Sequence, residues 1–303
     1  MLIVKNLSFS YNKALVLNDI SFQLKPGEIL AVIGESGSGK STLLKLLYGE
    51  YDLNQGHMFW NDQEILGPKY NLITGPEYMK YVAQEFDLMP FTTVAENIGA
   101  FLSNFYPEEK ENRIRELLEV VELTEHSQTK VKHLSGGQKQ RVALAKALAK
   151  QPEILLLDEP FSHIDNFKKQ SLRRSLFRFL KKENITCIVA THDKNDVMSY
   201  AQTMIVLENT KVIANNIPEA LYNNPINPLV ASFFGEFNTI ENEIIYAHQL
   251  QVVKQSNLKV TVEHSYYKGT HYLIAADYNG KTLFFEHPSR LKKNSTLFLT
   301  INR

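Results

Sequence analysis

The 303-residue chain has one cysteine and no excess of either charge, with 33 basic and 33 acidic residues. A single cysteine excludes a disulfide framework and fits a reducing cytosol. Cys187 lies in an apolar run that is typical of a buried strand, so we expect an inert core thiol. No basic stripe interleaved with aromatic residues is present, which argues against nucleic acid as a partner.

Long hydrophobic runs are also missing from the sequence. Its apolar stretches are far shorter than the ~20 residues that a helix needs to cross a bilayer. Residues Met1 to Lys5 lack the layout of a signal peptide. We therefore expect a cytoplasmic protein whose role at a membrane would come through partners.

A glycine-rich segment follows the first buried apolar run and fits the pattern G-x-x-x-x-G-K-[ST]. It consists of Gly34, Glu35, Ser36, Gly37, Ser38, Gly39, Lys40, Ser41 and Thr42. Residues 29–33 before it are typical of a strand, and residues 41–48 after it are typical of a helix. Glycines let successive N–H groups point at an anion, and the helix start adds positive potential. The segment therefore predicts a nucleotide phosphate site, where Lys40 reaches the β- and γ-phosphates and Ser41 offers its hydroxyl to Mg²⁺.

A second buried run, residues 154–157, ends in the adjacent carboxylates Asp158 and Glu159. In open α/β sheets, ligands lie beyond the carboxyl ends of the strands. We therefore expect both carboxylates to face the same crevice as the glycine-rich segment. Asp158 would hold Mg²⁺ through water, and Glu159 would act as general base toward the attacking water.

With these motifs in place, residues 2–235 resemble the nucleotide-binding subunits of ABC transporters. The glycine-rich segment matches Walker A, residues 154–158 match Walker B, and Glu159 matches the catalytic glutamate. Leu134, Ser135, Gly136, Gly137 and Gln138 match the family signature. The resemblance implies an α/β P-loop NTPase core at residues 1–235, with a helical subdomain at about 85–150. Residues 162–165 match the D-loop only in their first and last positions.

The resemblance also assigns roles to residues that the pattern alone leaves ambiguous. It implies that Tyr11 stacks on adenine, that Gln84 of the Q-loop contacts Mg²⁺, and that His192 contacts the γ-phosphate. It further implies that the signature segment, Ser135 to Gln138, covers ATP held by a second copy of the chain. ATP would then join two copies, and hydrolysis would let them separate.

Membrane partners follow from the same resemblance. In the family, the helical subdomain forms a groove for a short helix of a multi-span permease. An apolar cluster near Gln84, comprising Phe86, Leu88, Met89, Pro90 and Phe91, fits either that groove or local core. An external substrate-binding protein is a further expected partner, and the chain would lie on the inner face of the cell membrane through the permease.

The segment 168–182 carries basic residues at helical spacing between leucines and phenylalanine. Its cations are Lys168, Lys169, Arg173, Arg174, Arg178, Lys181 and Lys182. This pattern favours a solvated outer helix face over contact with lipid or nucleic acid.

Beyond residue 235 the pattern changes to short alternating strands separated by turn signals such as Asn279-Gly280. We expect residues 236–303 to form a small all-β, OB-like module. It is similar to the TOBE-type C-terminal module of importer subunits for ferric iron, polyamines, sulfate and molybdate. A regulatory or dimer-stabilising role is expected for it.

The sequence thus predicts an ATP-hydrolysing subunit of an ABC importer, with an inorganic ion or a polyamine as cargo. The motor of an exporter or of a lipoprotein-extraction complex carries the same motifs and stays an alternative. A soluble regulator of translation or DNA repair is disfavoured, because the chain has neither a second cassette nor a long coiled-coil insertion.

Overall fold

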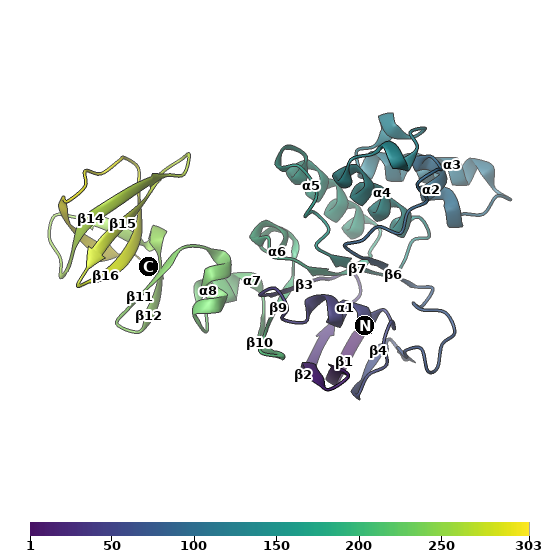
Figure 1. Cartoon of the computed structure of the whole chain (residues 1–303), viewed down its shortest axis with the longest axis horizontal. Helices are drawn as coiled ribbons and strands as arrows, with labels where there is room; N and C mark the ends of the chain where they lie inside the picture. Colours follow the sequence, from purple (N-terminus) through teal and green to yellow (C-terminus); the bar gives the residue numbers. More distant parts are fainter. Residues whose placement is uncertain (303) are drawn as a thin grey trace. The chain divides into compact units, whose positions relative to one another are not determined.

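The computed structural model describes residues 1–302 and divides the chain into two compact units, Met1–Pro218 and Glu219 onward. The division lies earlier than the change of pattern at residue 235. Two short helices that the sequence analysis did not predict, α7 (Pro218–Asn223) and α8 (Pro228–Phe234), fill the interval. Each unit is described by itself below (Figure 1).

The first unit is built on a six-stranded sheet with the order β10-β9-β3-β8-β7-β6. All neighbouring pairs are parallel except β9 and β10. Its strands are β3 (Ile29–Gly34), β6 (Met79–Val82), β7 (Ile154–Asp158), β8 (Thr186–Ala190), β9 (Thr203–Glu208) and β10 (Lys211–Asn216). Every residue of β7 and β8 is buried, as expected of apolar runs covered on both faces. Cys187 of β8 is fully buried, and burial raises the pKa of its thiol, in agreement with an inert core thiol.

A second sheet in the same unit is antiparallel, with the order β2-β1-β4-β5. Its strands are β1 (Leu2–Tyr11), β2 (Ala14–Leu24), β4 (Gln55–Trp60) and β5 (Gln63–Glu64). Helix α1 (Lys40–Leu47) buries four leucines in a hydrophobic core that includes residues of both sheets. The glycine-rich segment therefore ends in a helix that is fixed on a large core.

Helices of residues 94–148 lie side by side in Figure 1. They are α2 (Val94–Ile98), η1 (Gly99–Phe101), α3 (Pro107–Val120), η2 (Thr124–His126), η3 (Val131–His133) and α4 (Gly136–Leu148). Pro107 opens α3 with two glutamates in its first turn, and Thr93 caps α2 in a reciprocal box with Glu96. In the preceding segment Met89 is 39% exposed and Phe91 is 72% exposed, so these two members of the apolar cluster are not local core, whereas Phe86 and Leu88 are partly buried.

Helix α5 (Asn166–Lys182) corrects one expectation of the sequence analysis. Most of its cations face solvent, but Arg173 is only 1% exposed. Arg173 pairs with Asp193, just before α6 (Lys194–Tyr200), and with Asp196 inside it. The prediction was wrong for Arg173 because helical spacing places it on the same face as the buried Leu172 and Leu176.

The second unit is all β after its helices, as predicted. A two-stranded ribbon, β11 (Phe237–Ile240) and β12 (Glu243–Tyr246), precedes η4 (Ala247–Gln249). A five-stranded antiparallel sheet has the order β13-β17-β14-β15-β16. Its strands are β13 (Leu250–Val253), β14 (Leu258–Tyr267), β15 (Tyr272–Tyr278), β16 (Lys281–His287) and β17 (Thr296–Ile301).

Two local features stabilise this second unit. Asn279 and Gly280, both at positive φ, form the tight turn between β15 and β16. The buried Asn238 amide exchanges two hydrogen bonds of 2.7 Å with the backbone of Phe284, which joins the ribbon to β16. The unit has its own hydrophobic core, centred on buried residues such as Phe285 and Val262.

Within residues 1–302, no helix combines the length and the apolar content needed to span a membrane.

Candidate nucleotide site

Four neighbouring strands bring the predicted site residues to one edge of the parallel sheet. Strands β3, β8, β7 and β6 are adjacent in that order and run parallel. At their carboxyl ends lie Gly34, His192, Glu159 and Gln84, respectively, each in or just after its strand. The site is therefore assembled by sheet order rather than by sequence proximity.

These residues line one cavity of about 740 Å³. Its walls contain twelve of the predicted residues: Tyr11, Gly34, Ser36, Gly37, Gly39, Lys40, Ser41, Thr42, Gln84, Asp158, Glu159 and His192. The remaining loop residues, Glu35 and Ser38, lie between lining residues of the glycine-rich loop.

The glycine-rich loop has the backbone that an anion cradle needs. Gly39 precedes α1 with φ 99°, and a Cβ at this position would lie 2.9 Å from Leu17 Cδ2. A side chain at Gly39 would therefore be strained in conformation and crowded in space. Ser38 Oγ is buried and has no hydrogen-bond partner within residues 1–302, so the loop holds a polar atom that is left unsatisfied.

Lys40 is the cation of the cavity. Its Nζ donates to the carbonyl oxygens of Gly34 at 2.8 Å and Glu35 at 2.9 Å. Burial lowers the pKa of Lys40, while the nearby Glu159 and Asp158 carboxylates oppose that shift. The ammonium group is thus held near the phosphate loop and near both carboxylates of β7.

Asp158 and Glu159 have different surroundings. Asp158 Oδ2 accepts from the Tyr81 hydroxyl at 3.2 Å, whereas the buried Asp158 Oδ1 has no partner within residues 1–302. Burial, followed by the charge of Asp158, raises the pKa of Tyr81, so its hydroxyl stays a donor. Asp158 is therefore held from one side, with one oxygen left for a ligand.

Glu159 is fixed by its backbone and by His192. It has a positive φ of 51°, and its N–H donates to the Ala190 carbonyl at 2.9 Å. His192 Nδ1 lies 2.9 Å from Glu159 Oε1 and 2.8 Å from Oε2. The structure therefore brings the predicted general base and the predicted switch histidine into direct contact.

Tyr11 lies at the end of β1, on the wall of the cavity. Its ring packs edge-on against Phe9 and Tyr51, with centroids 4.9 and 5.4 Å away. Its hydroxyl lies 3.5 Å from Thr42 Oγ1, and the residue is 38% exposed. An exposed aromatic surface at this position is compatible with stacking on a base.

The signature residues do not line this cavity. Ser135 caps α4 and forms a reciprocal box with Gln138, while Gly136 has open space around its Cα. Gln138 also lies 3.0 Å from His126, measured between Nε2 atoms. The box leaves the N–H groups of Gly136 and Gly137 at the start of α4, where a helix has no partners of its own for them.

The signature helix is nevertheless attached to the loop that follows β7. Buried Gln140 donates to the Glu159 carbonyl at 2.9 Å and accepts from the His163 N–H at 3.2 Å. A Cβ on Gly137 would lie 2.6 Å from the His163 carbonyl oxygen. The start of α4 and the loop after β7 (residues 159–165) of the same chain are therefore closely packed.

Three lining residues were not predicted as site residues: Val16, Ser162 and His163. The match to the D-loop at its first position was a signal for Ser162, but it gave no ligand role in the same chain, and His163 lies where that match departs. Val16 gave no signal, because an apolar residue in an alternating strand is typical of ordinary sheet packing.

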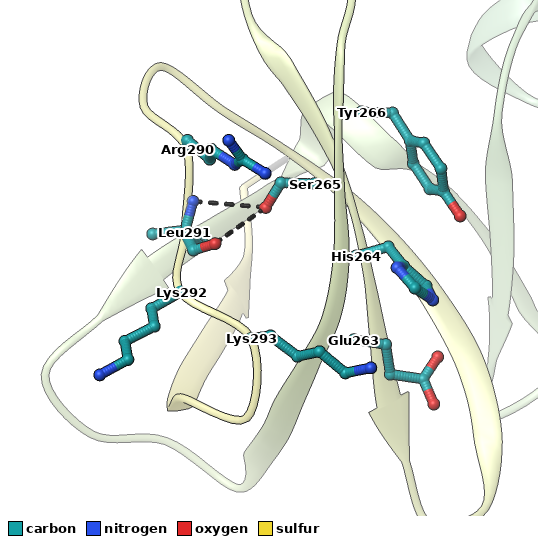
Figure 2. Close-up of a pocket in the computed structure, with 8 residues that line it drawn as sticks. All are labelled: Glu263, His264, Ser265, Tyr266, Arg290, Leu291, Lys292 and Lys293. Carbon is teal, nitrogen blue, oxygen red and sulfur yellow. Dashed lines mark hydrogen bonds between the residues drawn. The ribbon is translucent and has the colours of Figure 1, made fainter.

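A different depression, of about 510 Å³, lies in the second unit between β14 and the loop 290–293 (Figure 2). Ser265 Oγ holds the loop, because it donates to the Leu291 carbonyl at 3.1 Å and accepts from its N–H at 3.3 Å. Figure 2 shows Lys292 pointing away from Ser265, on the other side of the loop from His264. The basic side chains do not converge on one point, unlike the groups around Lys40.

Sequence comparisons agree with this geometry. The family model described as ABC transporter matches residues 17–162. The Fe(3+) ions import ATP-binding protein FbpC of Haemophilus influenzae is 38% identical over 238 residues, which cover 78% of this chain and 68% of that protein. The spermidine/putrescine import ATP-binding protein PotA of Thermotoga maritima is 34% identical over 256 residues, covering 84% and 68%. The sulfate/thiosulfate import ATP-binding protein CysA of Synechocystis is 34% identical over 241 residues, covering 79% and 67%.

Solved structures are similar to nearly three quarters of the chain. A dimeric ATP-binding cassette in a post-hydrolysis state with ADP and Pi superposes with a TM-score of 0.63 at 27% identity, covering 72% of this chain and 98% of that one. A subunit of an ABC transporter complex from Clostridium perfringens gives a TM-score of 0.64 at 28% identity, covering 73% and 90%.

Proposed function

Because the chain belongs to the ABC transporter family, we propose that it is the ATP-binding and ATP-hydrolysing subunit of an importer. The observation that carries this proposal is the single cavity shared by the glycine-rich loop, Asp158, Glu159 and His192. A phosphate cradle, a cation and a general base within one cavity are the parts that phosphoryl transfer to water requires.

Binding of ATP uses the loop and Lys40. Backbone N–H groups of the loop and the start of α1 receive the phosphates, and the Lys40 ammonium pairs with the β- and γ-phosphates. Lys40 now donates to two loop carbonyls, so these bonds are exchanged for bonds to phosphate on binding. Tyr11 supplies an aromatic surface for the adenine.

Mg²⁺ fits the residues that are present. The unpartnered Asp158 Oδ1, the Ser41 hydroxyl and the Gln84 amide oxygen all belong to residues lining the cavity. Such hard oxygen ligands suit Mg²⁺, and Asp158 would hold it through water. When bound, Mg²⁺ neutralises charge on the β- and γ-phosphates.

Hydrolysis is assigned to Glu159 with His192. Glu159 accepts a proton from the attacking water while the water oxygen bonds to the γ-phosphorus. The bond between the γ-phosphorus and the bridging oxygen breaks, and that oxygen leaves with ADP. His192, in contact with both carboxylate oxygens, holds Glu159 in orientation and meets the γ-phosphate through its other nitrogen. A general base contributes roughly 10² to 10⁴-fold to such a reaction.

A second copy of the chain completes each site in this proposal. The signature residues at the start of α4 are absent from the chain's own cavity. The reciprocal box takes up the N–H groups of Ser135 and Gln138, so the N–H groups of Gly136 and Gly137 are the ones that the first turn offers. They would close over ATP held by the partner copy. ATP binding joins the two copies, and loss of the γ-phosphate separates them.

A groove in the first unit supports the proposal that a permease docks on this unit. A cavity of about 480 Å³ is lined by Val82, Phe86 and Phe101 together with Asp87 and Lys146. Lys146 Nζ donates to the Asp87 carbonyl at 2.6 Å, which fixes one wall. A cavity lined by both apolar and charged side chains suits a short amphipathic helix from a multi-span membrane subunit. On this proposal the chain lies in the cytoplasm, at the inner face of the cell membrane.

The cargo is proposed at the level of class. The similar proteins are named for import of ferric ions, of spermidine and putrescine, and of sulfate or thiosulfate. We therefore favour an inorganic ion or a polyamine, delivered by an external binding protein. The part of the second unit that follows its helices, residues 236–303, is proposed as a TOBE-type regulatory module, on its antiparallel sheet and its position after the ATPase core in the sequence.

The proposal is tested by purifying a tagged Glu159→Gln chain from native membranes in mild detergent with ATP. Glu111→Gln, an exposed change on α3, is the matched control. We expect a multi-span permease to accompany the Glu159 variant in greater yield than the control. Recovery of a dimer without any membrane subunit would contradict a transport role and favour a soluble ATP-driven regulator.

A further inference from the structure

Arg173 occupies a core position of α5, where its buried neighbours Leu172 and Leu176 are apolar. Taking a guanidinium out of water costs several kcal/mol, and the attraction within a buried ion pair often does no more than offset this cost. Replacement of buried ion pairs by apolar side chains is often neutral or stabilising. The free energy of folding therefore does not explain why an arginine occupies this position, whereas the contacts of Arg173 do.

Two carboxylates meet the Arg173 guanidinium. Its Nη2 donates to Asp193 Oδ2, and its Nε donates to Asp196 Oδ1. Asp196 is 1% exposed, like Arg173, so this part of the cluster has almost no contact with water. Charge-assisted bonds in such surroundings hold their partners in a narrow range of positions.

The carboxylates fix the chain on both sides of His192. The Thr191 hydroxyl donates to Asp196 Oδ2 at 2.7 Å, and the Asp193 N–H donates to Thr191 Oγ1 at 3.0 Å. The His192 side chain itself is 75% exposed, and its ring contacts Glu159. The direction of His192 toward the cavity therefore depends on its two neighbours in sequence.

The face of the same guanidinium packs on the segment that carries Glu159. The Arg173 Cζ lies 5.3 Å from the centroid of the Phe161 ring. Phe161 is 2% exposed and follows Glu159 by two positions, with the Phe177 ring on α5 at 6.1 Å. One buried cation thus contacts both loops that supply the chemistry, although Arg173 does not line the cavity.

We infer that Arg173 is a positioning residue that holds Glu159 and His192 in register for ATP hydrolysis. This inference rests on the proposed ATPase function and adds to it the residue that joins the two catalytic loops. Arg173 acts on the rate of the chemical step and leaves the phosphate loop, which binds ATP, untouched.

Steady-state ATP hydrolysis by the full chain tests the inference in Arg173→Met and Arg173→Lys. Arg174→Ala is the matched control, because Arg174 is the adjacent exposed arginine of α5. A displacement of catalytic groups by about 1 Å can cost on the order of 10²-fold. We expect Arg173→Met to lower kcat by roughly 10 to 100-fold with KM for ATP nearly unchanged. Arg173→Lys should be intermediate, because an ammonium cannot reproduce the two-carboxylate fork or the stacking on Phe161.

A folding control separates position from stability, because Arg173→Met leaves the buried Asp196 and the partly buried Asp193 without their cation. The triple variant Arg173→Met, Asp193→Asn, Asp196→Asn removes all three charges. We expect it to unfold cooperatively near the wild-type temperature and still to show a low kcat. The His192 ring resonances, assigned with His192→Gln, should also shift in Arg173→Met without nucleotide.

Two outcomes would overturn the inference: wild-type kcat in a folded Arg173→Met or triple variant, or His192 resonances that do not move. Failure of the underlying function gives a different result, since wild type and Arg174→Ala would then both lack ATP turnover. An active wild type with unaffected Arg173 variants rejects only the positioning role.

Discussion

Lys40 shows how single residues of the site are prepared before any ligand binds. Its ammonium donates to two loop carbonyls and lies close enough to Glu159 and Asp158 for their charges to act on it. Burial lowers its pKa, yet the two carboxylates counteract that shift. The charge is therefore kept at the loop, where phosphate oxygens can replace the carbonyls.

Lys40→Ala should weaken ATP binding by at least about tenfold, which corresponds to about 1.4 kcal/mol. The expected cause is loss of the cation that pairs with the β- and γ-phosphates. Titration with a fluorescent ATP analogue measures the dissociation constant, and Lys5→Ala, at an exposed lysine, is the control. An unchanged dissociation constant in Lys40→Ala would place the phosphates elsewhere.

Asp196 gives a prediction about pH. Burial raises its pKa to about 6 and outweighs the hydrogen bond from Thr191 and the charge of Arg173. A raised pKa means that the folded state binds the proton more tightly than the unfolded chain. This carboxyl therefore contributes stability that is complete below its ordinary pKa of 3.8 and is lost as pH rises through about 6.

The free energy of unfolding of wild type, minus that of Asp196→Asn, should accordingly fall between about pH 4 and pH 6 and then level off. The slope is at most about 1.4 kcal/mol per pH unit. Urea denaturation at several pH values measures it. A difference that rises over this range would mean that Arg173 lowers the pKa of Asp196 instead.

Single residues also mark where sequence reasoning stopped. The basic pattern of α5 predicts a solvated outer face, although helical spacing puts Arg173 on the buried face with Leu172 and Leu176. The carboxylates that neutralise Arg173 there, Asp193 and Asp196, lie 20 and 23 residues further along the chain, so no local pattern indicates the pairing. His163 likewise lines the cavity because of the path of its loop, and that path cannot be predicted from the sequence.

At the scale of elements, strands and helices around the site could be predicted from the sequence. Fully apolar runs such as residues 154–157 have few alternatives to a buried strand, and Gly39 has few alternatives to a tight turn before a helix. Helices α7 and α8 were missed because each is short and carries little periodicity. Sheet order, which brings His192 beside Glu159, is set by tertiary packing.

The contact between α4 and the loop after β7, residues 159–165, gives a prediction at this scale. Gly137→Ala places a methyl group where a Cβ would lie 2.6 Å from the His163 carbonyl oxygen, so the two segments must shift. We expect a loss of about 1–3 kcal/mol in the free energy of unfolding.

Gly136→Ala is the matched change for that measurement, because a Cβ there meets nothing within 4 Å. The alanine should be neutral or slightly stabilising in a helix. Urea denaturation of both variants gives the comparison. Equal stability of the Gly136→Ala and Gly137→Ala variants would show that α4 is not closely packed against the loop after β7.

At the scale of the whole molecule, the proposed function predicts that two copies are needed to complete a site. Ser135 lies at the start of α4, outside its own chain's cavity. In a Glu159→Gln background, wild-type Ser135 should give an ATP-dependent dimer by light scattering. Ser135→Arg should stay monomeric while each chain still binds ATP, because the bulky side chain occupies the place of the partner's γ-phosphate.

Ser135→Ala is the control for loss of the helix cap, which by itself costs about 1 kcal/mol. It should dimerise more readily than Ser135→Arg. A dimer of normal strength in Ser135→Arg would contradict a signature that closes over the partner's ATP.

The sequence predicts an α/β unit followed by a β-rich unit, because the change to alternating strands with turn signals is visible in it. The position of the division was not, because contacts rather than composition place the break at Pro218. Cargo and permease are beyond the sequence for a physical reason: the residues that would contact the cargo belong to other chains.

The central claim is that Glu159 activates water for ATP hydrolysis in this cavity, and the turnover number of Glu159→Gln tests it most directly. The amide keeps the shape of the side chain but cannot accept the proton. We predict that kcat falls by at least about 100-fold while ATP binding persists, with Glu111→Gln unchanged. Full turnover by a folded Glu159→Gln would contradict the account, because the proton would then have another acceptor.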